Sequence, residues 1–141
     1  PCTFVTVNDA NNLCYTVTTF RRSSPTPITI DGQDTGGEWS GSPQKSFIGS
    51  FNGSIRFVKQ GNDLLFLLQS DDSINQSDAD HFLLLFDPLH NQGTTTDDRI
   101  FRINRNNANH SITQDGTETP WNPGAALAIS ENGASWTAEL R

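Results

Sequence analysis

Apolar and polar residues alternate with a period of two in several short segments of the chain, for example residues 55–57, 101–104 and 136–140. Such alternation places one face of a strand on a core and the other face in water. No segment keeps the helical period for three turns, and turn residues recur between the alternating segments. The pattern therefore predicts an all-β chain built as a sandwich or barrel.

Two predicted strands, residues 64–68 and 82–86, are apolar without interruption. A sandwich strand with one face in water alternates, so a continuous run indicates burial on both faces. We expect a long loop, a neighbouring subunit or a ligand to cover the outer face. The candidate loop is 106–124, which contains Trp121.

The first residues predict an N-terminal β-hairpin, with strands at 3–7 and 15–20 joined by a turn. Such a hairpin can bring Cys2 and Cys14 opposite each other. A disulfide closing a loop of this size stabilises a fold by about 3 kcal/mol; two unpaired, buried thiols are the alternative. We expect residues 1–24 to be this hairpin, or the end of a preceding domain, plus a linker, and 25–141 to be the sandwich domain.

Composition and charge narrow the possible partners. The chain has 141 residues, which fits one domain, and a net charge of −7. The acidic balance argues against nucleic acid and against an anionic membrane surface as partners. The sequence opens at Pro1 and contains no methionine, which suggests a mature or excised piece of a longer protein. Together with the cysteine pair and Asn-x-Ser triplets, this predicts a secreted or cell-surface location.

Motifs for catalysis are missing from the sequence. It contains no nucleophile elbow, zinc-protease motif, phosphate-binding glycine loop or Cys-x-x-Cys. The three histidines, His81, His90 and His110, do not have the spacing of metal ligands. We therefore expect the protein not to be an enzyme.

The acidic segment 71–80 is the predicted metal site. Calcium takes six to eight oxygen ligands, which loops rich in Asp and Asn supply. The candidate ligands are Asp71, Asp72, Asp78 and Asp80. The spacing is not that of an EF-hand, and a solvated acidic turn is the alternative.

The three tryptophans suggest a ligand site. Trp39 and Trp136 are expected in the core, whereas Trp121 lies in an irregular segment stiffened by a proline on either side. Sugar binding requires a flat aromatic face bordered by groups that bond hydroxyls. Trp121 is therefore the predicted stacking platform, unless it covers the apolar strands instead. The nearby candidates for bonding hydroxyls are Asn122, Gln114 and Arg105.

Four segments, in this order, resemble family 9 carbohydrate-binding modules and their DOMON-like relatives. They are Ile28–Gly32 followed by Glu38-Trp39, Gly61–Leu68 with Asp71, His81–Asp87, and Ser135–Glu139. The resemblance covers 28–141 and implies an antiparallel β-sandwich of the immunoglobulin-like or jelly-roll type. Some such modules hold structural calcium. Haem-binding DOMON relatives use a Met/His pair, and with no methionine here no haem is expected.

In that family the glutamate strand runs on, whereas this sequence stops at Arg141, so the sandwich is expected to be incomplete at its C-terminus with an open sheet edge. The sequence thus predicts a non-catalytic extracellular module that recognises a glycan or polysaccharide by aromatic stacking. The alternative is a structural or assembly module of a large extracellular or surface protein. That module would use an open sheet edge and an apolar face to contact neighbouring domains or subunits.

Overall fold

The computed structural model describes residues 4–8, 14–18, 27–48, 52–74, 80–86, 99–106, 110–114, 117–119 and 124–141. The strands in these ranges are β1 (Phe4–Asn8), β2 (Cys14–Thr18), β3 (Gln44–Ile48), β4 (Asn52–Gln60), β5 (Asp63–Ser70), β6 (His81–Phe86), β7 (Arg99–Asn104), β8 (His110–Gln114), β9 (Thr117–Thr119), β10 (Leu127–Glu131) and β11 (Trp136–Leu140). One short 3-10 turn, η1, spans Thr35–Gly37. None of these ranges forms a helix that could span a membrane.

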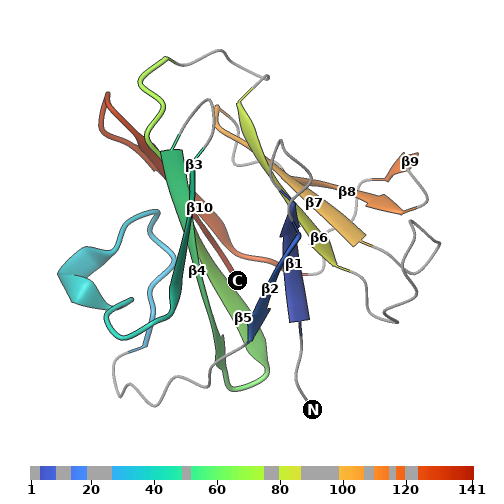
Figure 1. Ribbon diagram of the computed structural model, residues 1–141, viewed down its shortest axis with the longest axis horizontal. Helices are drawn as coiled ribbons and strands as arrows, with labels where there is room; N and C mark the ends of the chain where they lie inside the picture. Colours follow the sequence, from blue (N-terminus) through green and yellow to red (C-terminus); the bar gives the residue numbers. More distant parts are fainter. Residues whose placement is uncertain are drawn as a thin grey trace.

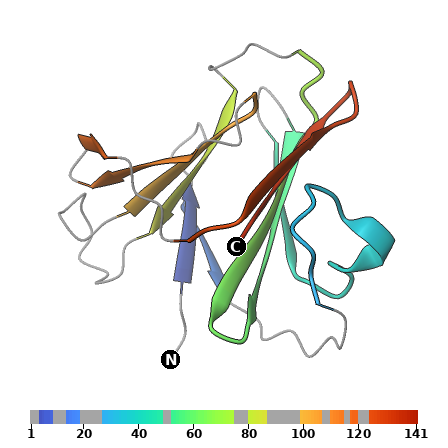
Figure 2. The ribbon, with the colours of Figure 1, turned by 180° about the vertical axis from the view of Figure 1, so that it is seen from behind.

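Two antiparallel sheets pack against each other, as Figures 1 and 2 show from opposite sides. One sheet has the strand order β10-β11-β5-β4-β3 and the other the order β6-β7-β8-β9. The predicted all-β sandwich is therefore confirmed. The last strand, β11, lies inside its sheet between β10 and β5, so the edges of that sheet are β10 and β3.

The main core fills the space between the two sheets, because alternate residues of the strands on both sides point into it. Its buried side chains are Ile55, Phe57, Phe66, Leu68, Leu84, Ile103, Trp136, Ala138 and Leu140. The ring of Trp136 lies 4.2 Å from that of Phe82, centroid to centroid, and joins the two sheets. The prediction that Trp136 belongs to the core is confirmed.

A second core lies on the outer face of the five-stranded sheet. Leu65 and Leu67 of β5 point outward there and pack with Val58, Ile28 and Trp39. These contacts explain the continuous apolar run in β5, whose predicted burial on both faces is confirmed. Trp39 is fully buried, as predicted for a core residue.

Among the described residues, the segment 27–43 covers this outer face, and those of the predicted loop 106–124 do not. In Figures 1 and 2 this segment (cyan) lies on the side of the five-stranded sheet away from the other sheet. Within 106–124, the described residues instead include β8 and β9, which extend the four-stranded sheet. The prediction failed because loop composition gives no indication of which sheet face a segment packs on.

Strand β6 was predicted to be buried on both faces, and this prediction is wrong. Leu84 points into the core with 5% of its surface exposed, whereas Leu83 is 58% exposed on the other face. At Leu83 the outer face of the four-stranded sheet therefore meets solvent.

The predicted N-terminal hairpin is present as β1 and β2, and β1 lies beside β6. Its register pairs Cys14 with Asn8, at the end of the hairpin next to the turn. Cys2 comes before Phe4 in the chain and lies outside the described residues. The pairing of Cys2 with Cys14 therefore stays a prediction.

Gly53 of β4 has no room for a side chain. It pairs with Phe47, whose ring lies over it, and an added Cβ would overlap that ring and come 2.5 Å from the carbonyl oxygen of Gln69. We expect Gly53→Ala to lower the free energy of unfolding by about 1–3 kcal/mol, because the strands must move apart. Urea denaturation measures this loss.

The control is Ser46→Ala, at an exposed position of β3, which should change stability by less than about 0.5 kcal/mol. Equal effects of the two variants would show that Gly53 is not tightly packed.

Candidate functional site

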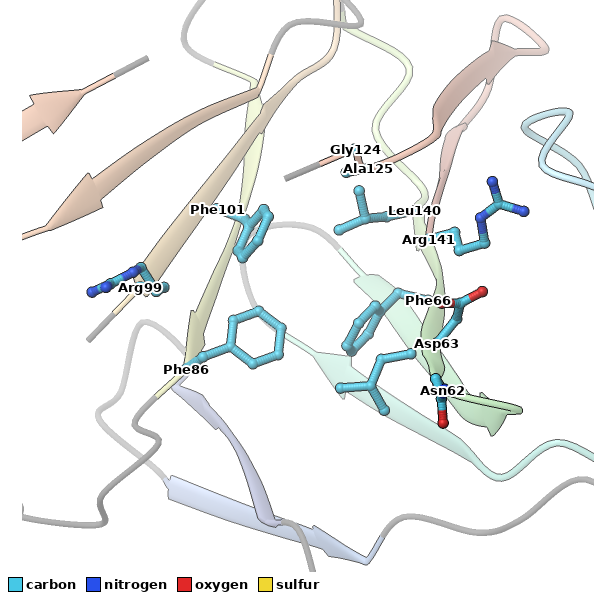
Figure 3. A pocket seen from close by; sticks show the side chains of 11 residues that line it. Asn62, Asp63, Phe66, Phe86, Arg99, Phe101, Gly124, Ala125, Leu140 and Arg141 are labelled. Atoms are coloured by element: carbon cyan, nitrogen blue, oxygen red, sulfur yellow. The ribbon is translucent and has the colours of Figure 1, made fainter. Parts of the chain in front are cut away.

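A pocket opens between the two sheets, with a volume of about 500 Å³. Its lining comes from both sheets and from the β4–β5 turn: Asn62, Asp63, Leu64, Phe66, Phe86, Arg99, Phe101, Gly124, Ala125, Leu140 and Arg141. Figure 3 shows the Phe86 and Phe101 rings facing Phe66 and Leu140 across this space. The volume is typical of a cavity that holds a small ligand.

Three aromatic rings from the two sheets line the pocket. Phe86 contacts Phe66 edge-on at 5.7 Å between ring centroids and Phe101 at 5.3 Å. Alternation within β6 and β7 turns Phe86 and Phe101 inward, and β5 brings Phe66 from the opposite sheet. Only Phe66 is fully buried, so the other two rings keep surface that a ligand can contact.

The rim of the pocket is polar. Asn62 and Asp63 lie at the β4–β5 turn, while Arg99 and Arg141 border the pocket with side chains directed away from its centre (Figure 3). These groups provide both donors and acceptors for hydrogen bonds. Asp63 is the one carboxylate among the described residues that line the pocket.

Three of the sequence-predicted ligand residues cannot be placed. Trp121 and Asn122 lie outside the described residues, as does the side chain of Gln114 at the end of β8. In the sequence, Trp121 precedes Gly124, a residue of the pocket lining, by three positions.

Arg105, the fourth predicted residue, is buried and does not face a ligand. Its side chain is 1% exposed, and its guanidinium lies 3.2 Å from Asp80, 3.8 Å from Asp72 and 3.3 Å from Glu131. It also donates to the carbonyl of Ile74 at 3.1 Å. The expectation that Arg105 bonds sugar hydroxyls is corrected, because its guanidinium is enclosed by these partners.

The same contacts bear on the predicted calcium site. The carboxylates of Asp72 and Asp80 neutralise the guanidinium of Arg105, and a calcium ion placed beside it would meet like charge. Asp72 also accepts the backbone N–H of Ile74 at 2.8 Å. Asp71 is exposed, and Asp78 lies outside the described residues. Asp72 and Asp80 are therefore not free to act as the predicted ligands.

A different group of carboxylates lies where the segment 27–43 meets β11, at positions that the sequence did not single out for a metal. Glu139 of β11 is fully buried on the outer face of the five-stranded sheet. Its Oε2 accepts the backbone N–H groups of Asp31 and Gly32, each at 2.8 Å, and its Oε1 accepts the indole N–H of Trp39 at 2.6 Å. One side chain thus fixes the covering segment to the sheet.

Glu38 lies beside Glu139 and completes the group with Asp31. Its Oε2 accepts the backbone N–H of Thr29 at 2.8 Å, while its Oε1 is buried and has no hydrogen-bond partner. One carboxylate oxygen from each of Asp31, Glu38 and Glu139 lies within 4.8 Å of the others. Burial raises the pKa of Glu139, and the charge of Glu38 adds to this, against the opposing effect of its N–H donors.

Comparison with known proteins gives no relative. No family model, curated protein or solved structure matches this chain. The resemblance to family 9 carbohydrate-binding modules therefore stays a prediction from the quoted residues.

Proposed function

We propose that this domain is a non-catalytic binding module that takes a sugar ring of a glycan into the pocket between its sheets. The observation that carries the proposal is the aromatic lining formed by Phe66, Phe86 and Phe101 inside a polar rim. A pyranose ring has an apolar C–H face and a polar edge of hydroxyls, which match an aromatic surface and a hydrogen-bonding rim.

The rim supplies the groups that a sugar edge requires. Asn62 offers a donor and an acceptor and Asp63 accepts, whereas the side chain of Arg141 is directed away from the pocket centre. A ligand entering the pocket would also cover apolar surface on the half-buried rings of Phe86 and Phe101. The polar contacts give orientation and specificity, and the apolar contact supplies most of the affinity.

A screen of the whole chain against a glycan array, followed by calorimetric titration of the best hit, tests this function. We expect Phe101→Leu to weaken binding by about tenfold, because it removes a flat ring worth about 0.5–1.5 kcal/mol in a stacked contact. Leucine keeps the site apolar, so the melting temperature checks that the fold is retained.

The matched control is Phe47→Leu on β3, which changes the same residue type away from the pocket and should leave affinity unchanged. Trp121→Ala belongs in the same series, because Trp121 was the platform predicted from the sequence. A folded Phe101→Leu protein that binds like the wild type would place any glycan site elsewhere.

The alternative, a structural or assembly module, stays a prediction. The described residues that favour it are Ile48 at the β3 edge and Leu83 on β6, both exposed. Single exposed apolar residues are normal on protein surfaces and do not define an interface.

A further inference from the structure

Among the described residues, Glu38 and Glu139 are two buried carboxylates without a basic partner. Glu139 is fully buried and Glu38 is 6% exposed. Within the described part of the chain, neither forms an ion pair with a lysine or arginine. The guanidinium of Arg56 pairs with Asp34 instead. Burying unpaired charge is strongly unfavourable, so this site needs a proton or a cation to neutralise it.

The free oxygen of Glu38 distinguishes this group from an ordinary acidic cluster. Its Oε1 is buried, has no hydrogen-bond partner and belongs to a side chain whose other oxygen is already fixed by Thr29. The Oε1 of Glu38 is therefore a fixed, buried acceptor, and an electropositive partner would satisfy it. Glu139 also keeps capacity, because each carboxylate oxygen has two acceptor positions and its Oε1 uses one, for Trp39.

The spacing of the oxygens suits one ion. Calcium binds oxygen at about 2.3–2.6 Å, so oxygens on opposite sides of one ion lie about 5 Å apart and neighbouring ones lie closer. The oxygens of Asp31, Glu38 and Glu139 lie within 4.8 Å of one another. Asp31 is exposed, and its carboxylate accepts the backbone N–H of Gln33 at 2.9 Å and the hydroxyl of Thr35 at 3.0 Å.

The donor set also selects the metal. All three side chains offer hard oxygens, whereas zinc prefers nitrogen and sulfur ligands. Magnesium demands near-ideal octahedral geometry, whereas calcium accepts the irregular geometry of side chains already held by hydrogen bonds. We propose that Asp31, Glu38 and Glu139 bind a calcium ion that joins the covering segment 27–43 to β11.

Thermal unfolding of the whole chain with chelator, calcium or magnesium is the first experiment. We expect calcium to raise the melting temperature by several degrees and magnesium to have a smaller effect, because an ion that binds only the folded state stabilises it. Calorimetric titration should give one calcium ion per chain at this site. No response of the chelated wild type to millimolar calcium would overturn the proposal.

Substitutions locate the ion. Glu38→Gln should abolish the calcium response, and Asp31→Asn, at an exposed position where folding is less sensitive, should weaken calcium binding by about tenfold or more. Asp71→Asn is the control from the acidic segment 71–80 and should keep the full response. A response lost in Asp71→Asn but kept in the other two variants would contradict the assignment.

Terbium gives an independent spectroscopic test, since it replaces calcium and its emission is sensitised by a nearby tryptophan. The indole nitrogen of Trp39 lies 2.6 Å from the Oε1 of Glu139. We expect sensitised emission that calcium displaces in the wild type and that Glu38→Gln loses. Emission that is unchanged in Glu38→Gln would place the ion elsewhere. Neither test involves a sugar, so failure of the glycan proposal leaves these results unaffected.

Discussion

Replacing Arg105 with methionine should lower the free energy of unfolding by about 3–5 kcal/mol. The guanidinium is almost completely buried and lies against Asp80 and Asp72, whose side chains are 10% and 4% exposed. Its removal leaves these charges in the interior without a counter-charge. It also removes the cation that lies 5.9 Å from the ring centre of Trp136. Urea denaturation at neutral pH measures the loss.

The matched control is Arg56→Met, because Arg56 forms an ion pair with Asp34 at the same 3.2 Å distance but near the surface. Solvent screens that pair, so its loss should change stability by less than about 1 kcal/mol. Similar losses in the two variants would mean that burial adds nothing to the role of Arg105.

Glu139→Ala should lower the free energy of unfolding by about 3–5 kcal/mol. The substitution removes the acceptor of three N–H groups at once: those of Asp31, Gly32 and the Trp39 indole. Each buried donor left without a partner costs about 1–3 kcal/mol, although neighbouring losses do not add fully. Measurement in chelator separates this effect from any loss of a bound ion.

The Glu139→Ala variant also has a local signature. The segment 27–43 is fixed to the sheet through Glu139, so the amides of Asp31 and Gly32 should exchange with deuterium faster than in the wild type. Thr137→Ala, at the outward position two residues earlier in β11, is the control and should affect neither readout strongly. Equal losses of stability in the two variants would contradict the conclusion that Glu139 fixes the segment 27–43 to the sheet.

The sequence predicted the strands well because a strand is a local pattern. The alternation in residues 55–57 and 101–104 predicts β4 and β7 without knowledge of the rest of the chain. The uninterrupted apolar run in β5 likewise predicts burial on both faces. The same rule failed for β6, because a run of apolar residues does not show whether anything covers its second face.

The sites were harder to predict because they depend on contacts between distant residues. Glu139 meets Asp31 and Gly32 across more than a hundred residues, and nothing in either segment alone indicates this contact. Arg105 lies between two asparagines in the sequence and therefore resembled a surface residue. Its carboxylate partners come from β10 and from the acidic segment, which only the folded chain brings together.

The most direct test of the proposed function is an NMR titration of the ¹⁵N-labelled domain with the best ligand from the glycan array. The account predicts amide shifts that concentrate around the pocket, at residues 62–66, 99–101, 124–125 and 140–141. Shifts that cluster on the β3 edge or around Leu83, or the absence of any response to glycans, would contradict a sugar site between the sheets.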